Sequence, residues 1–315
     1  MASCPGEGWG RGISVFRLDQ VVPQADCLGD SMLVEEKARA FDAVVIGHFA
    51  KDKIIVGGEE TVASGGSVYY GAIAMQRLGL RVAVVTRLAQ DDFPRLDELE
   101  DEGIIVFAQP AAETSGIENT YFTEDMDQRH TKPLGFAGPI HVKDVPDIRA
   151  SIWLIGPIMA GEVDLTFVRA AAEKGAVALD AQGFVRVREG DELVFRDWPE
   201  KAEGLNYVDF LKVDSAEAEV LTDHTDLRQA AAVLAGYGVR EVVVTHAQGV
   251  LVCAGGEHYE APFTAREIRG RTGRGDTCFA AYLARRLASP PQEACRFAAL
   301  VASLKMEAPG PFRGF

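Results

Sequence analysis

The chain has 315 residues, of which 47% are hydrophobic and 25% are charged. This composition excludes a disordered chain and fits a soluble globular protein with one large domain or two ordinary ones. The 47 acidic and 32 basic side chains give a formal net charge of −15, which repels nucleic acids and anionic membrane surfaces. We therefore expect no nucleic-acid or membrane partner, and an anionic substrate must be bound by a local arrangement of groups.

The five cysteines are scattered and never spaced CxxC, so the sequence indicates neither a disulfide framework nor a zinc site. No apolar run approaches the roughly 18 residues of a spanning helix, and the N-terminus lacks the pattern of a secretion signal. We expect a cytoplasmic protein. The dipeptide Gly-Lys is absent from the chain, which excludes a Walker A phosphate-binding loop.

Residues 1–41 show no apolar periodicity and are interpreted as a loose N-terminal extension. From residue 42 onward, short β-branched runs alternate with amphipathic stretches. The runs predict buried parallel strands at 43–47, 82–86, 152–156, 176–180, 210–214 and 241–245. The stretches predict helices at 67–78, 164–174, 227–237, 276–288 and 292–306. This order predicts an α/β fold in which a doubly wound, mostly parallel sheet is flanked by helices.

Two segments break the alternation. Residues 49–63 include a Gly57-Gly58 turn, and residues 117–134 have the pattern of a strand, a polar turn and a strand, so both are typical of hairpins. Inserted strands commonly cover the carboxyl edge of an α/β sheet, where open α/β folds bind ligands. We therefore expect one domain spanning 42–315, with these segments as a small β-strand lid.

The stretch GRTGRGDT at 270–277 leads without a break into an apolar helical pattern. Its three glycines permit a tight turn, and the helix N-terminus that follows offers free N–H groups and a positive dipole to phosphate oxygens. Asp276 has two interpretations here. It is either the N-cap of the helix, or a general base that accepts the proton of a hydroxyl as that oxygen attacks a phosphoryl group held by the same amides.

The same stretch resembles the DTxGAGD signature of the ribokinase-like (PfkB) carbohydrate kinases. The matching positions are Thr272, Gly273, Gly275 and Asp276, and the departures are Gly270, Arg271 and Arg274. The resemblance implies that Asp276 is the catalytic base and that the backbone from Gly273 to Asp276 forms an anion hole, with Thr272 beside the donor phosphates. Arg274 either adds a positive charge near the phosphates or points to solvent.

The resemblance extends across nearly all of 42–315. Gly65-Gly66 is similar to a glycine pair that lets the family's backbone approach the sugar, and Asp52 matches a substrate-binding aspartate. A carboxylate suits this task because it can accept hydrogen bonds from adjacent hydroxyls. The alternative is that Asp52 is an exposed acid in a turn. Tyr70 stands where the family commonly has asparagine, so one usual substrate contact is missing.

Two further motifs concern the donor. Asp214 and Glu217 resemble an NxxE motif that organises Mg²⁺ near the donor phosphates, and hard oxygen ligands suit Mg²⁺. The same two residues could cap a helix beginning at Ser215. Thr245 and Gly249 match the family's nucleotide-contacting turn.

A finer resemblance is to the inositol-kinase-like branch, through the run from Leu179 to Arg186 and the run from Phe210 to Lys212. It implies that Gln182 contacts a ring hydroxyl, and the alternative is that Gln182 is a polar loop residue. Together these motifs imply a kinase that uses ATP and Mg²⁺, and in some relatives a monovalent cation, to phosphorylate a hydroxyl of a sugar or cyclic polyol. Myo-inositol is favoured. Pairing of lids, as in some relatives, would give a homodimer. The alternatives are a nucleoside or phosphosugar kinase, or a catalytically silent sugar- or nucleotide-binding homologue.

Overall fold

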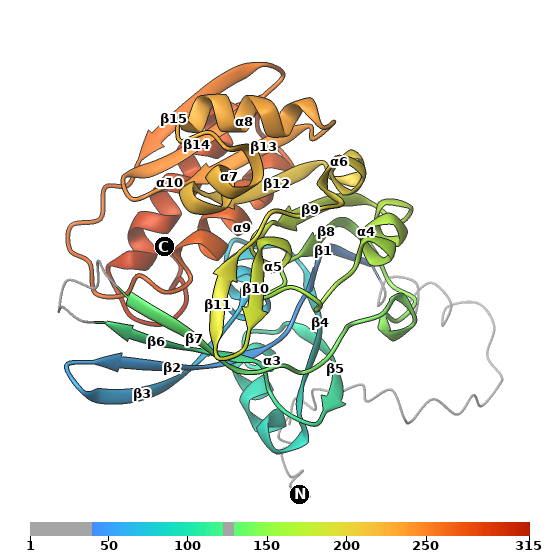
Figure 1. The fold of residues 1–315 in the computed structure, drawn as a ribbon, viewed down its shortest axis with the longest axis vertical. Helices are drawn as coiled ribbons and strands as arrows, with labels where there is room; N and C mark the ends of the chain where they lie inside the picture. The colour runs from blue at the N-terminus through green and yellow to red at the C-terminus, as the bar shows by residue number, and fades with distance from the viewer. Residues whose placement is uncertain (1–39, 122–128) are drawn as a thin grey trace, which may run out of the picture.

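The computed structural model describes residues 40–121 and 129–315, and a nine-stranded sheet forms its centre (Figure 1). The strand order across this sheet is β15-β14-β13-β12-β9-β8-β1-β4-β5. The strands are β1 (Ala40–Ile46), β4 (Val82–Ala89), β5 (Ile105–Ala111), β8 (Arg149–Ile155), β9 (Ala176–Asp180), β12 (Phe210–Asp214), β13 (Glu241–Thr245), β14 (Gly249–Ala254) and β15 (Glu257–Pro262). The strands from β13 to β5 run parallel to one another. Strand β14 pairs antiparallel with β13, and β15 pairs antiparallel with β14.

All six predicted strands are present in this sheet and run parallel to one another, which confirms the predicted α/β class. Strand β1 starts earlier than expected, because Ala40 and Phe41 already pair with Arg149 and Ala150 of β8. These two residues had been assigned to the N-terminal extension, whose other residues, 1–39, lie outside the described part of the chain.

Helices cover both faces of the sheet. On one face, α2 (Ser67–Arg77), α9 (Arg274–Arg286) and α10 (Pro291–Met306) pack over a core that includes Val45 of β1. On the other face, α4 (Leu165–Ala172), α7 (Ser215–Thr222) and α8 (Leu227–Gly236) pack over Val44 and Ile46. Successive side chains of a strand point to opposite faces, so burial on both faces explains the continuous apolar runs.

Shorter elements connect these layers. They are the helices α3 (Asp97–Glu100), α5 (Gln182–Val185) and α6 (Lys201–Gly204), the 3₁₀ turns η1 (Gln90–Leu96), η2 (Val142–Asp144) and η3 (Leu205–Tyr207), and a hairpin of β10 (Arg186–Glu189) and β11 (Glu192–Phe195). In the part of the chain that the structure describes, no helix combines the length and apolar character needed to cross a bilayer.

A second, four-stranded sheet projects from the large one, at the lower left of Figure 1. It consists of β2 (Ala50–Val56), β3 (Glu59–Gly65), β6 (Gly116–Tyr121) and β7 (Arg129–Gly135), in the order β3-β2-β6-β7. The two predicted hairpin segments thus form one small sheet, in which β2 and β6 pair in parallel. The turn between β6 and β7 lies outside the described residues, and the role of this sheet as a lid stays a prediction.

Candidate active site

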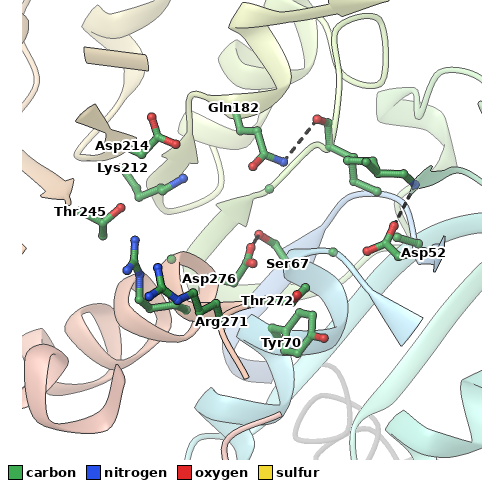
Figure 2. Close-up of a pocket in the computed structure, with 18 of the residues that line it drawn as sticks. Asp52, Ser67, Tyr70, Gln182, Lys212, Asp214, Thr245, Arg271, Thr272 and Asp276 are labelled. Atoms are coloured by element: carbon green, nitrogen blue, oxygen red, sulfur yellow. Dashed lines mark hydrogen bonds between the residues drawn. The ribbon is translucent and has the colours of Figure 1, made fainter. Parts of the chain in front are cut away.

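A cavity of about 370 Å³ lies at the carboxyl edge of the large sheet, between the small sheet and the N-terminus of α9 (Figure 2). Most residues that the sequence analysis selected line this cavity: Asp52, Gly66, Gln182, Asp214, Thr245, Thr272, Gly273, Arg274, Gly275 and Asp276. Gly65, Glu217 and Gly249 do not line it. In Figure 2, Asp52 lies on one side of the cavity, and Lys212, Asp214 and Thr245 lie on the other.

The N-terminus of α9 is shaped by Gly273. This residue caps the helix in the left-handed conformation, with φ of 78°, and Arg274 is the first helical residue. A Cβ atom at Gly273 would lie 2.2 Å from Cγ of Tyr70, so only glycine fits both the conformation and the close packing. The first N–H groups of a helix have no partners within it. Those of Gly275 and Asp276 are therefore available to an anion in the cavity.

Asp276 is the third residue of α9, so its interpretation as the N-cap is wrong. Its Oδ1 atom instead accepts a hydrogen bond from the hydroxyl of Ser67, the first residue of α2. Figure 2 shows this contact at the centre of the cavity, between the two sides. The carboxylate is thus held by a group from a distant part of the chain and still reaches the cavity.

Asp52 of β2 is only 7% exposed, which contradicts the alternative that it is an exposed turn acid. Its Oδ1 atom accepts the N–H of Ile117 at 2.9 Å. A Cβ atom at Gly65 would lie 2.4 Å from Oδ2 of Asp52, and one at Gly66 would lie 2.7 Å from the carbonyl oxygen of His48. The glycine pair therefore makes room for the Asp52 carboxylate and the main chain, and only Gly66 reaches the cavity.

Two amide side chains extend the wall near Asp52. Gln182 donates its main-chain N–H to Asp180 at 3.0 Å and its Nε2 hydrogen to the carbonyl of Ile158 at 3.3 Å. Asn119 of β6 is buried and lines the cavity, and its Oδ1 accepts the hydroxyl hydrogen of Thr131 at 3.0 Å. The sequence analysis missed Asn119. Carboxylate and amide groups suit a ligand that carries several hydroxyls.

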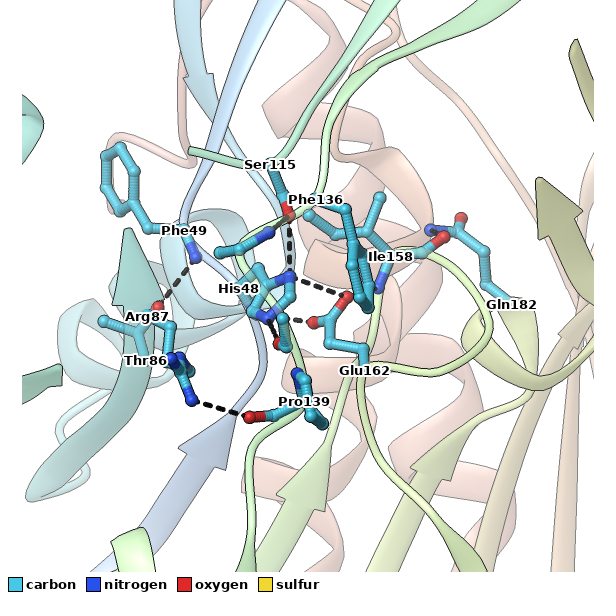
Figure 3. Close-up of polar contacts among 12 residues, drawn as sticks. His48, Phe49, Thr86, Arg87, Ser115, Phe136, Pro139, Ile158, Glu162 and Gln182 are labelled. Atoms are coloured by element: carbon cyan, nitrogen blue, oxygen red, sulfur yellow. Dashed lines mark hydrogen bonds and ion pairs between the residues drawn. The ribbon is translucent and has the colours of Figure 1, made fainter. Parts of the chain in front are cut away.

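A buried polar network supports this wall from behind (Figure 3). The side-chain oxygens of Glu162 accept the N–H groups of His48, at 2.5 Å, and Ile158, at 2.8 Å. Burial raises the pKa of this carboxyl to about 8, and the N–H groups that it accepts oppose the shift. Burial lowers the pKa of His48 to about 3, so its neutral ring donates from Nε2 to the carbonyl of Gly138 and accepts at Nδ1 from the hydroxyl of Ser115. Glu162 thereby joins the segment after β1 to the segment after β8.

The other side of the cavity is cationic. Its lining includes Arg186, Lys212, Arg271 and Arg274. Lys212 of β12 is buried, with Nζ 3.0 Å from Asp180 and 3.4 Å from Glu217. Burial alone would lower the pKa of Lys212, but the surrounding carboxylates, above all Asp180, raise it, so its ammonium stays protonated. A strongly acidic protein thus places four cationic side chains around one cavity.

Asp214 and Glu217 form the helix cap that the sequence analysis gave as an alternative to a metal site. Asp214 accepts the N–H of Glu217 at 2.9 Å, and Glu217 accepts the N–H of Asp214 at 2.7 Å. Asp214 also lines the cavity, whereas Glu217 is fully buried behind it. Within residues 40–121 and 129–315, no group of three or more His, Cys, Asp or Glu side chains is arranged as a metal site.

The two residues matched to a nucleotide-contacting turn differ in position. Thr245, at the end of β13, lines the cavity. Gly249 begins β14, and a Cβ atom there would lie 2.4 Å from the carbonyl oxygen of Ala261 in β15. The glycine is therefore explained by the close approach of two antiparallel strands.

Comparison with known proteins agrees with this fold. A model of the pfkB carbohydrate kinase family matches residues 168–313. A structure of a pyrophosphate-dependent kinase in the ribokinase family, complexed with a pyrophosphate analog and myo-inositol, is 38% identical, with a TM-score of 0.81 over 86% of this chain and 97% of that chain. Arabidopsis thaliana ribokinase, complexed with ribose and ATP, shares the fold at 23% identity and a TM-score of 0.70, over 87% and 95% of the two chains.

Among curated proteins, a cytidine kinase of Thermococcus kodakarensis is 27% identical over 266 residues, which span 81% of this chain and 91% of that protein. The fold and the relatives define a phosphotransferase that acts on a hydroxyl group of a sugar or polyol. The chain belongs to the pfkB family of carbohydrate kinases.

Proposed function

We propose that this enzyme transfers a phosphoryl group from inorganic pyrophosphate to a hydroxyl of myo-inositol or a closely related cyclic polyol. The observation that carries the proposal is the set of four cationic side chains that line the cavity, which the N-terminus of α9 also lines. Pyrophosphate has no nucleoside to contribute binding contacts, so its charged oxygens must supply nearly all the affinity. Two of the four cations, Arg271 and Arg274, occupy positions where the sequence departs from the family signature.

The shape of the cavity favours this donor over the ATP expected from the sequence. ATP would need further wall for its nucleoside. Among the described residues that line the cavity, none comes from β14, β15 or α10. Gly249, for which the family resemblance implies a nucleotide contact, does not line the cavity. The 38% identical structure of a pyrophosphate-dependent kinase supports the same choice.

The acceptor side supports a polyol. Asp52, Asn119 and Gln182 bring a carboxylate and two amides to the cavity, and Ile117 and Ile158 add apolar surface. A cyclic polyol presents hydroxyls around its rim and C–H groups on its faces, which this mixture can match. The relative bound to myo-inositol supports that ring as the first candidate.

In the proposed reaction, the acceptor hydroxyl oxygen forms a bond to one phosphorus of pyrophosphate. The bond from that phosphorus to the bridging oxygen breaks, and orthophosphate leaves. Asp276 accepts the hydroxyl proton, and the hydrogen bond from Ser67 orients its carboxylate. The pKa of an alcohol is far above neutrality, so this proton moves late. The barrier is lowered mostly by the alignment of the acceptor oxygen with the phosphorus and by the charges around it. These are the first-turn N–H groups of α9, Lys212, Arg271 and Arg274.

The residues also fit Mg²⁺ bound together with the donor. Asp214 lines the cavity, and Mg²⁺ commonly binds one or two carboxylates plus phosphate oxygens and water. When bound, the ion would neutralise charge on the phosphate oxygens. Glu217 does not reach the cavity and would act by fixing Asp214 through the helix cap.

The test compares pyrophosphate with ATP as donor over myo-inositol, ribose, fructose, fructose phosphates and nucleosides, with the phosphorylated product detected by ³¹P NMR. We expect turnover with pyrophosphate and a cyclic polyol, and none in D276N. R274A should raise the KM for pyrophosphate about tenfold or more while the acceptor KM stays constant. Arg169 is exposed and pairs with Glu203, so R169A is the matched control. Turnover with ATP alone would reject the donor, and polyol binding without turnover would favour a silent homologue.

A further inference from the structure

A buried lysine on α10 contacts the turn that precedes α9, which we call the anion-hole turn (residues 270–273). Lys305 is only 2% exposed, and its Nζ donates a hydrogen bond to the carbonyl of Gly270 at 3.0 Å. The same Nζ lies 5.4 Å from the centre of the Tyr70 ring, and the face of an aromatic ring attracts a cation. Burying an ammonium group costs free energy unless partners compensate it. Its position beside this turn therefore calls for a functional explanation.

Lys305 contacts the start of the anion-hole turn directly and its end through Tyr70. At the start, it binds the Gly270 carbonyl directly. At the end, it acts through Tyr70, whose ring packs on Gly273 so closely that a Cβ atom would overlap it. The N–H groups of Arg269 and Gly270 also donate to the carbonyl of Met306, at 2.9 and 3.1 Å. The C-terminal turn of α10 thus holds the segment that shapes the N-terminus of α9.

The ammonium of Lys305 also attracts the carboxylate of Asp276. Lys305 lines a second cavity of about 410 Å³, which shares the lining residues Tyr70, Arg271 and Thr272 with the first cavity. Lys305 itself is buried, so its charge lies next to the anion-hole turn at a position where screening by salt is weak.

The sequence resemblance allowed for a monovalent cation, and the residues here do not fit one at this turn. Such an ion would need carbonyl oxygens of the turn as ligands, and the Gly270 carbonyl already accepts from Lys305. We propose that Lys305 is a positioning residue whose ammonium serves as the built-in cation of the anion-hole turn, so that phosphoryl transfer needs no added potassium or ammonium ion. This inference rests on the phosphoryl transfer proposed above.

The test uses two variants that both lack the charge. K305M keeps the volume of the side chain, whereas K305A leaves space for a small cation. Assays run in tetramethylammonium buffer, with K⁺ or NH₄⁺ added. We expect the wild type to respond less than about twofold to these ions, and both variants to lose at least about tenfold in kcat with little change in acceptor KM. NH₄⁺ or K⁺ should restore the kcat of K305A in a saturable manner and leave the kcat of K305M at its lowered value.

Lys174 provides the control, because its ammonium lies 5.2 Å from the Trp153 ring centre at an exposed position; K174M should behave as wild type. Wild-type kcat in K305M, or a wild type that itself depends on K⁺, would overturn the proposal. If K305A does not fold, K305M decides by its kcat. If pyrophosphate supports no turnover, the same comparison is made with ATP. If neither donor works, calorimetric binding of pyrophosphate decides: unweakened binding in K305M overturns the proposal, independently of the proposed reaction.

Discussion

The hydroxyl of Ser67 donates a hydrogen bond to Oδ1 of Asp276, and this contact joins the first turns of α2 and α9 across 209 positions of sequence. A third segment makes the contact feasible. A Cβ atom at Gly156 would lie 2.3 Å from Cβ of Ser67, so the glycine after β8 leaves the space that the serine occupies. The orientation of the proposed base therefore depends on three separate parts of the chain.

Replacing Asp276 with asparagine should lower kcat by a factor on the order of 10² or more, because the amide cannot accept the hydroxyl proton. Acceptor binding should stay close to that of the wild type. S67A should show a smaller loss, since the carboxylate remains and only its orientation is relaxed. Turnover assays and calorimetric titration with the acceptor measure both effects. Equal turnover of D276N and the wild type would remove Asp276 from the mechanism.

Replacing Lys212 with methionine should lower the free energy of unfolding of the protein as well as its kcat. The variant leaves the buried carboxylates of Asp180 and Glu217 without their cation, and breaking such a pair typically costs about 3–5 kcal/mol. The loss should shrink as the pH falls, because the two carboxyls then take up protons. Urea unfolding at two pH values measures this. R228A, which breaks an exposed pair with Glu260, should cost at most about 1 kcal/mol. Equal losses in the two variants would argue against the buried arrangement.

Replacing Gly249 with alanine tests whether this glycine serves the packing of two strands or contacts the donor. An alanine there would meet the main chain of β15, so G249A should lower the free energy of unfolding by about 1–3 kcal/mol. The donor KM should remain within about twofold of the wild-type value, because Gly249 does not line the cavity. Gly236 at the end of α8 has open space around it, which makes G236A the control. A large rise in donor KM with normal stability would return Gly249 to the site.

Raising the pH above about 8 should lower kcat and should raise the free energy of unfolding of the wild type relative to that of K305M. Burial lowers the pKa of Lys305 from 10.5 to about 8, and Asp276 opposes this shift. As the pH rises through about 8 the folded protein loses the ammonium, so kcat should fall. Between pH 8 and 10.5 the unfolded chain binds more protons at this residue, so the stability of the wild type relative to K305M should rise.

Other ionisable groups share the surroundings of Lys305. They are Asp276 on α9, Tyr69 and Tyr70 on α2, Arg269 and Arg271 before α9, and Arg95 and Glu98 across the second cavity. The comparison with K305R separates Lys305 from them, because a guanidinium stays protonated throughout this range. The alkaline fall in kcat should move to higher pH in K305R. Superimposable profiles of the two proteins would assign the fall to another group.

Replacing Glu162 with glutamine should affect the acceptor KM and leave the donor KM unchanged, when both proteins are compared above pH 8, where the Glu162 carboxyl is ionised. The amide would direct its own N–H₂ group toward the main-chain N–H of His48 or of Ile158. One buried donor then loses its acceptor, at a cost of about 1–3 kcal/mol. We expect a lower melting temperature and a higher acceptor KM, with an unchanged donor KM. E219Q, on the exposed side of α7, should change neither value. A change in donor KM alone would contradict this role for the network.

The sequence predicted the centre of the fold well, because strands buried on both faces need continuous apolar runs. It failed at the edges. Strand β5 contains Pro110, a residue that disfavours strands and is tolerated here because β5 is an edge strand. The hairpin of β10 and β11 is short, charged and half-exposed, so its pattern is weak.

The site was predicted where a motif is local, as at the anion-hole turn, and missed where a role depends on distant partners. Ser67 has no distinctive sequence pattern, and its role follows only from the contact between α2 and α9; Lys212 lies between the apolar residues Leu211 and Val213 of β12. Motif spacing also cannot separate a ligand contact from close strand packing, which is why Gly249 was selected. A cytoplasmic location and a homodimer stay predictions, because the fold of one chain tests neither.

The two sides of the cavity follow one another along the chain. The proposed acceptor side comes from segments between Asp52 and Gln182, and the cations of the proposed donor side come from segments between Arg186 and Arg274. A single genetic crossover in the β10–β11 region would therefore exchange most of the donor side and keep the acceptor side intact. Within such a family, the choice of phosphate donor and the choice of alcohol can be inherited separately, so that a new pairing of the two arises in one recombination event.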